Sequence, residues 1–233
     1  HYFSGLKFNV INKALFGAGI LGILIFVFPS LFGEGYESIK ILADNNPAQL
    51  VQNTVFERFE NNSWILLLFV GATMLIKVYA TSLTLGAGGN GGNFAPSLFV
   101  GSYLGFCVSY FVNLTGLAKL SVGNFTLVGM AGILSGLFHA PLTAIFLIAE
   151  ITGGYNLMVP LMVVSSVSFA ISKRFETYSF YIKNLADKGE VFTDNRDTNI
   201  LNSIDVAKLI QTDFKAVSVS SNLEELVEKI QQS

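Results

Sequence analysis

The chain has 233 residues, of which 52% are hydrophobic and only 13% are charged, with a formal net charge of −2. Soluble domains carry about 25% charged residues, so this composition excludes an ordinary soluble protein and indicates an integral membrane protein. Between Glu60 and Glu150 the only charged residues are Lys77 and Lys119. The membrane region is therefore expected to include most of this stretch.

Apolar stretches separated by glycine, proline and polar breaks predict a series of helices. They are expected at residues 14–32, 38–43, 63–85, 94–113, 125–137, 141–151 and 157–172, with Ser63 as the N-cap of the third. Several fall short of the roughly 20 residues that a simple membrane span needs. Short, interrupted helices are typical of channels and transporters. The expected fold class is an all-α polytopic membrane protein.

The chain changes character after residue 172, where ordinary soluble sequence begins. Lys173 and Arg174 close the last apolar helix, which predicts a cytoplasmic location for that end. Residues 178–191 are expected to form a linker with a helical pattern. Residues 206–233 predict a small α+β fragment with a strand at 215–219 and a helix at 223–230. Such a fragment is too small to be a stable domain by itself.

A glycine-rich break at residues 86–97 interrupts an uncharged run, 78–118, that is too long for one membrane helix. Irregular backbone at membrane depth is tolerated only where it is buried or lines a cavity. A helix that begins at Phe94 has unpaired N–H groups with partial positive charge at its start. Gly92 lets an ion approach the backbone, and Pro96 fits a first turn. This pattern predicts an anion site, although the glycines could instead serve only close helix crossing.

Other site chemistries find little support in the sequence. The spacing of Gly86, Gly88 and Gly91 formally matches a dinucleotide-binding pattern, but no strand precedes it and no acid follows until Glu150. The chain has no cluster of cysteine and histidine, so no metal site is expected. It also has no nucleophile–base pair, so we do not expect an enzyme.

Lys77 interrupts an apolar stretch upstream of the glycine-rich break. Its charge could raise the local concentration of anions. Alternatively, its long side chain could snorkel to the membrane interface. The sequence leaves both interpretations open.

Four stretches together resemble one known family. Gly92-Asn93-Phe94-Ala95-Pro96 resembles the G-x-F-x-P signature of the CLC family of chloride channels and chloride/proton antiporters. Three further stretches resemble family segments in order and spacing, at residues 33–37, 140–153 and 179–185. The resemblance covers essentially the whole chain.

The resemblance implies a CLC-type fold and a domain organisation. Residues 1–190 would be the C-terminal part of the transmembrane domain, containing the second inverted repeat with short, tilted and broken helices. Residues 191–233 would be a linker and an incomplete first CBS domain. The chain would then be a fragment, and the N-terminal half of the same protein would supply the remaining walls of the pathway.

The resemblance also implies a set of anion-binding residues. These are Gly92, Asn93, Phe94 and Ala95 through the main chain, and Tyr181 through its hydroxyl. Tyr178 is the rival for the tyrosine role, because it lies three residues earlier on nearly the same helix face. No catalytic residue is implied.

The partners implied are chloride or similar small anions as transported ligands, the lipid bilayer, and a second copy of the protein through residues 141–172. No resident cofactor and no nucleic acid are expected. An adenine nucleotide would bind only a complete pair of CBS modules, so no nucleotide site is assigned. The expected location is the plasma or inner membrane, with a cytoplasmic C-terminal region.

Two modes of transport remain open alternatives: a channel, including a voltage-gated chloride channel, and a proton-coupled antiporter. The glutamates that discriminate between them would lie upstream of residue 1. Two further interpretations are kept. One is an unrelated broken-helix transporter for another anion, and the other is a membrane scaffold or sensor that transports nothing.

Overall fold

The computed structural model describes residues 9–52, 54–188, 222–224 and 227–228. Its described residues form eight α-helices and three short 3-10 helices, and no strand occurs among them. The elements are α1 (Val10–Val27), η1 (Pro29–Leu31), α2 (Tyr36–Ala43), η2 (Pro47–Leu50), η3 (Glu57–Phe59), α3 (Ser63–Gly86), α4 (Phe94–Thr115), α5 (Val122–Phe138), α6 (Pro141–Ile151), α7 (Met158–Phe175) and α8 (Phe180–Ala186). The predicted all-α architecture is confirmed.

Length and apolar composition let three described segments cross a membrane: Ser63–Gly86, Phe94–Thr115 and Met158–Ala186. Three further apolar helices, Ile11–Val27, Val122–Phe138 and Pro141–Ile151, are shorter. This mixture of long and short apolar helices agrees with the interrupted spans that the sequence predicts. The predicted strand at 215–219 lies outside the described residues, as does the predicted domain boundary at 190. Positions 223, 224, 227 and 228, within the predicted last helix, are helical.

Several helix ends differ from the sequence prediction by a few residues, and two of the differences have a clear local cause. The first helix ends at Val27 rather than residue 32, because the residue before a proline avoids the α region. Phe28 accordingly has φ −126° and ψ 81°, and Pro29 begins the separate turn η1. The N-cap of α3 is Asn62 rather than Ser63. The Asn62 carboxamide oxygen accepts hydrogen bonds from the backbone N–H groups of Trp64 and Ile65, at 3.1 and 3.3 Å.

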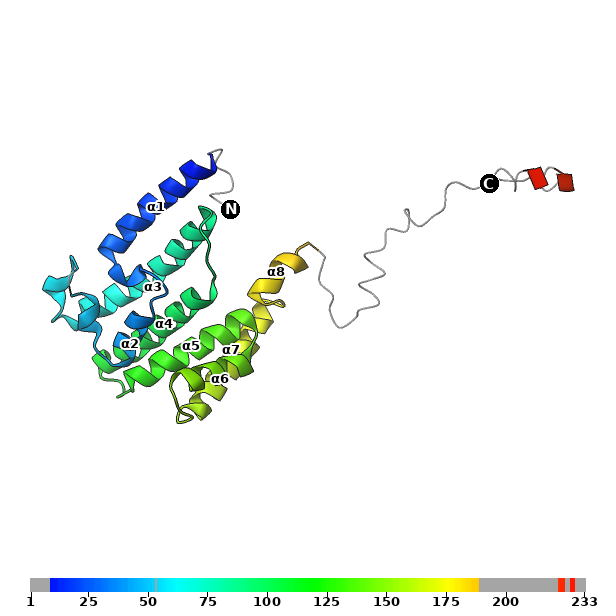
Figure 1. The fold of residues 1–233 in the computed structure, drawn as a ribbon. Coiled ribbons are helices and arrows are strands. Elements are labelled where there is room, and N and C mark those ends of the chain that lie inside the picture. Colours follow the sequence, from blue (N-terminus) through cyan, green and yellow to red (C-terminus); the bar gives the residue numbers. More distant parts are fainter. Residues whose placement is uncertain (1–8, 53, 189–221, 225–226, 229–233) are drawn as a thin grey trace. The chain divides into compact units, whose positions relative to one another are not determined.

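The core is built around α4 and α5, which lie side by side in Figure 1. The helix α3 packs on α4, α7 packs on α5, and α1 lies against α3. Glycines let α4 and α5 approach each other closely. A Cβ at Gly101 would lie 2.6 Å from the Gly129 carbonyl oxygen, and one at Gly105 would overlap the Phe125 carbonyl oxygen. Close approach of this kind is how membrane helices gain packing energy.

Serine hydroxyls join α5 to α7. Ser168 Oγ donates to the Gly132 carbonyl oxygen at 2.7 Å, and Ser172 Oγ donates to that of Gly136 at 2.5 Å. Ser135 Oγ, on α5, donates in the opposite direction to the Ser165 carbonyl oxygen. These bonds fix the register between α5 and α7. Because α5 also packs on α4, they connect α7 to α4, the helix whose start carries the candidate site.

We expect Gly105→Ala to destabilise the protein by about 3 kcal/mol, because overpacking costs this much when the neighbour cannot move. The neighbour here is backbone, the carbonyl of Phe125. The matched control is Gly71→Ala on α3, where an added Cβ meets nothing within 4 Å and helix propensity improves by about 1 kcal/mol. Thermal unfolding of both variants in detergent tests this. Equal stability of the two variants would contradict the packing described.

Candidate functional site

The glycine-rich break begins where α3 ends. The N–H of Ala87 closes the last turn by donating to the Leu83 carbonyl oxygen at 2.9 Å. Gly88 then adopts φ +93°, a conformation that side chains disfavour. The N–H of Gly89 donates back to the Thr84 carbonyl oxygen at 2.9 Å. The chain thereby leaves the helix and runs without regular structure until α4 begins at Phe94, as the sequence predicts.

The first turn of α4 leaves its backbone donors available. The N–H groups of Phe94 and Ala95 donate no hydrogen bond within the part of the chain that the structure describes. The Asn93 side chain does not cap the helix, and Pro96 has no N–H to offer. Such helix starts carry partial positive charge and favour anions. The local geometry is therefore that of an anion-attracting helix terminus.

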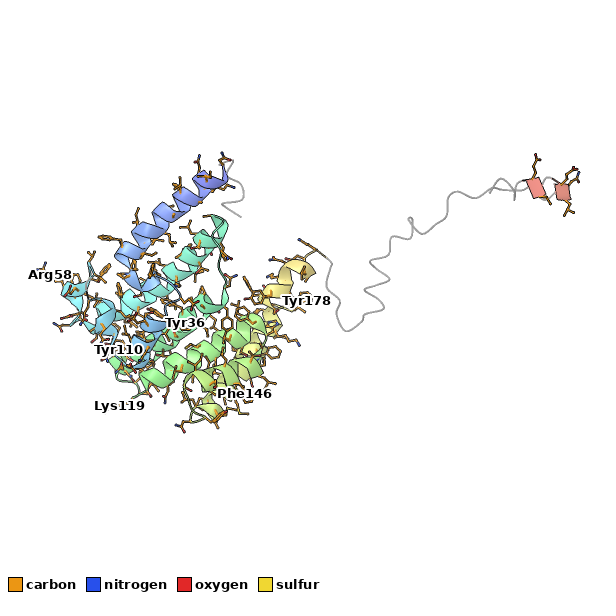
Figure 2. All side chains as sticks on the ribbon, in the orientation of Figure 1. Tyr36, Arg58, Tyr110, Lys119, Phe146 and Tyr178 are labelled. Atoms are coloured by element: carbon orange, nitrogen blue, oxygen red, sulfur yellow. The ribbon has the colours of Figure 1, made fainter. Side chains whose placement is uncertain are left out.

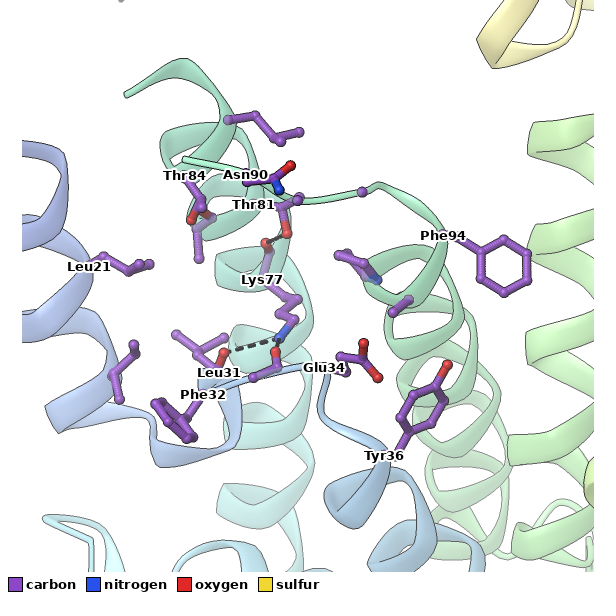
Figure 3. A pocket seen from close by; sticks show the side chains of 18 residues that line it. Leu21, Leu31, Phe32, Glu34, Tyr36, Lys77, Thr81, Thr84, Asn90 and Phe94 are labelled. Atoms are coloured by element: carbon purple, nitrogen blue, oxygen red, sulfur yellow. Dashed lines mark hydrogen bonds between the residues drawn. The ribbon is translucent and has the colours of Figure 1, made fainter. Parts of the chain in front are cut away.

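A cavity of about 640 Å³ lies next to this helix start. Figure 3 shows its walls, which come from α1, the turn before α2, α3, the glycine-rich break and the start of α4. Three of the predicted anion-binding residues, Gly92, Phe94 and Ala95, are among the lining residues. Asn93 and Tyr181 are not. The structure therefore brings part of the predicted set to one cavity.

Lys77 lies in the wall of this cavity and is only 3% exposed. Its Nζ donates to the carbonyl oxygens of Leu31 and Gly33, at 3.0 and 2.8 Å. It also lies 4.8 Å from the centre of the Phe99 ring. The snorkelling interpretation of Lys77 is therefore wrong, because backbone carbonyls solvate the ammonium inside the protein. A buried charge needs such partners.

Two glycines let the backbone adopt the turn that accepts these bonds. Gly33 and Gly35 have φ of +62° and +84°. A Cβ at Gly35 would also overlap the ring of Phe99, so the turn packs directly on α4. Glu34 lies between the two glycines and lines the cavity. Glu34 is not among the residues that the sequence predicts for the site, although an acid between two glycines in a family-like turn is a usable signal.

Tyr181 does not line the cavity, but a series of aromatic ring contacts links it to the start of α4. Its ring stacks on Phe138 with centroids 5.1 Å apart, and Phe138 lies 5.8 Å from the ring of Phe94. The Tyr181 side chain is 57% exposed. Tyr178, labelled in Figure 2, makes no ring contact of this kind among the described residues. Of the two tyrosines, Tyr181 is therefore the one that packs toward Phe94.

Composition and the long apolar helices define an integral membrane protein, and comparison with known proteins gives the family. The family model described as voltage gated chloride channel matches residues 1–173. This chain belongs to that family, the CLC family.

Relatives include both channels and exchangers by name. The chain is 32% identical to chloride channel protein CLC-e of Arabidopsis thaliana, over 72% of this chain and 24% of the relative. It is 30% identical to a putative chloride channel protein ClcB-like of Ralstonia nicotianae, over 73% of this chain and 36% of that protein. It is 29% identical to the H(+)/Cl(−) exchange transporter ClcA of Vibrio cholerae, over 63% and 28%. The chain thus spans about a quarter to a third of these relatives.

We expect Lys77→Met to loosen the turn at residues 31–35, because it removes two hydrogen bonds from a charged donor. A bond of this type contributes about 1.5–3 kcal/mol, so local opening should increase by about tenfold or more. Hydrogen–deuterium exchange at the Leu31 and Phe32 amides measures this, since both donate to carbonyl oxygens of the adjoining η1 segment, those of Phe28 and Pro29.

The control is Thr81→Val, one helical turn further along α3. Thr81 lines the same cavity, but its hydroxyl bonds only the Lys77 carbonyl oxygen of its own helix. This variant should leave exchange at residues 31–32 unchanged. Unchanged exchange in Lys77→Met as well would show that Lys77 does not hold the turn.

Proposed function

We propose that this chain forms one side of the anion pathway in a longer CLC-type channel or chloride/proton exchanger. The observation that carries the proposal is the start of α4, where unpaired amides border a cavity that also contains a buried lysine. The transported ligand is chloride or a similar small anion. The N-terminal half of the same protein supplies the remaining walls of the pathway.

The chemistry of the cavity suits passage rather than tight capture. Conduction requires binding strong enough for entry and weak enough for release. Amide N–H groups carry partial charges only. The full charge of Lys77 is partly offset by the carbonyl oxygens of Leu31 and Gly33. It adds a positive field without presenting an unsolvated ammonium to the ion, so a small anion is attracted but not trapped.

The same proposal includes the assembly and orientation of the protein. Helices α6 and α7 mediate a homodimer, which is supported by large apolar side chains exposed along both. These are Leu142, Phe146, Ile151, Val159, Met162, Val163, Val167 and Ile171. Lys173 and Arg174 in the last turn of α7 support a cytoplasmic location for the C-terminal region. That region begins a CBS domain, and the protein resides in the plasma or inner membrane.

The full-length protein reconstituted in liposomes should release trapped chloride when an ionophore dissipates the membrane potential. Flux would be followed with a chloride electrode, and external pH would be recorded at the same time. Chloride movement accompanied by opposite proton movement identifies an exchanger, and movement without it identifies a channel. Intact, folded protein without anion flux would overturn the proposal in favour of a scaffold or sensor.

We further propose that the Tyr181 hydroxyl donates to the anion, and that Asn93 contributes its backbone. Tyr181→Phe keeps the ring that stacks on Phe138 but removes the donor. A hydrogen bond to a charged group contributes about 1.5–3 kcal/mol, so chloride affinity should fall by about tenfold or more. Isothermal titration of the full-length protein measures this.

Tyr178→Phe is the matched control for this experiment, because it removes the same group three residues earlier on the chain. Chloride affinity should match the unmodified protein. A loss of affinity in Tyr178→Phe with none in Tyr181→Phe would exchange the two assignments.

A further inference from the structure

Tyr103 lies in the middle of α4, and its exposed fraction is 0%. Its ring stacks on that of Phe99 with the centroids 3.9 Å apart. Its hydroxyl, however, makes no hydrogen bond within the part of the chain that the structure describes. Buried polar groups nearly always have a partner, either a protein group or an ordered water. Because Tyr103 is fully enclosed, a segment elsewhere in the protein cannot reach the hydroxyl, whereas a single water can be enclosed with it.

The segment before and into α2 provides polar surroundings for this hydroxyl. Ser38 and Ser30 carry the hydroxyls that interact with that of Tyr103, although neither meets it in hydrogen-bond geometry. Ser38 Oγ donates its proton to the Gly35 carbonyl oxygen at 2.7 Å, so toward Tyr103 it can only accept. Ser30 lies in η1 and is half-buried. Three hydroxyls from α4, α2 and η1 thus converge, and together they offer both donors and acceptors.

We propose that an ordered water molecule bridges the hydroxyls of Tyr103, Ser38 and Ser30. A buried water typically makes about three hydrogen bonds to groups that would otherwise be unsatisfied, and this site offers three. The water accepts from the Tyr103 hydroxyl, donates to Ser38 Oγ and directs its second hydrogen at Ser30 Oγ. Polar contacts that are not made directly are commonly closed in this way.

The water gives the turn before α2 a second attachment to the helix core. The first is Lys77, whose Nζ donates to two carbonyl oxygens of the turn. Tyr103 stacks on Phe99, the ring whose centre Lys77 approaches to 4.8 Å. Through the water Tyr103 holds Ser30 and Ser38, which lie on either side of these carbonyls in the sequence. This attachment does not depend on whether the cavity carries an anion.

Tyr103→Phe removes the hydroxyl and keeps the ring that stacks on Phe99. Removing an unpartnered buried hydroxyl relieves a cost, so it would tighten the surrounding structure, whereas removing a water-bridged hydroxyl loosens it. The Ile39 amide, which donates to the Gly35 carbonyl oxygen at 3.1 Å, reports on this place. We expect its hydrogen–deuterium exchange in the full-length protein to be about fivefold faster in the variant, since one hydrogen bond is lost. Unchanged or slower exchange overturns the inference.

Tyr110→Phe is the matched control, because it removes the same group from the same helix two turns further along. Tyr110, labelled in Figure 2, also stacks on a phenylalanine, Phe106, with the centroids 5.0 Å apart. It is half-buried, and its hydroxyl is not among the buried groups without a partner. Exchange at Ile39 should equal that of the unmodified protein. Equal acceleration in both variants would show a general effect of the lost hydroxyl and would count against the water.

Ser30→Ala tests whether this serine shares the same water with Tyr103. If one water joins both hydroxyls, the second change acts on a bridge that is already broken. The double variant should then exchange more slowly at Ile39 than the product of the two single effects predicts. Effects that multiply in full overturn the shared water.

Cryo-electron microscopy of the full-length protein, at a resolution that shows ordered waters, tests the site directly. A density peak within hydrogen-bond distance of the three hydroxyls supports the inference. Direct contact between the Tyr103 hydroxyl and a serine oxygen, with no peak between them, overturns it even where Tyr103→Phe loosens the turn.

Discussion

The hydrogen bonds from Lys77 to the carbonyls of Leu31 and Gly33 are the interaction on which the candidate site depends. A lysine buried among apolar helices needs partners that solvate its charge. The turn before α2 supplies them, and so a segment 44 residues earlier in the chain is tied to the middle of α3. This contact builds the wall of the cavity that faces the start of α4, and it sets where Glu34 lies.

The opposite wall depends on how closely helices can approach. Glycines at the α4–α5 crossing bring backbone against backbone, and serine hydroxyls then join α5 to α7. Because these contacts involve carbonyl oxygens rather than flexible side chains, α4 has little freedom to slide. The amides at Phe94 and Ala95 are thereby held at a fixed place beside the cavity, which suits a site that must not reorganise for every passing ion.

The cavity combines partial charges of backbone amides with one ammonium that backbone carbonyls already solvate. The amides at the start of α4 and the carbonyl-solvated ammonium of Lys77 border the same cavity. In the anion pathway that we propose, this combination keeps affinity moderate, as conduction requires.

The sequence by itself determined the membrane class, the all-α fold and the start of α4, because composition and the helix-starting pattern of glycines and proline act over a few residues. It also indicated the family through four stretches taken together, among them Gly92–Pro96. Local pattern could not reveal the partners of Lys77, the place of Glu34 in the cavity, or the stacking of Tyr181 on Phe138, which joins residues 43 positions apart. These depend on which helices cross and at what depth. Only the tertiary structure decided them. Such contacts form between segments far apart in the chain, and the local sequence of one segment does not specify which other segment it will contact.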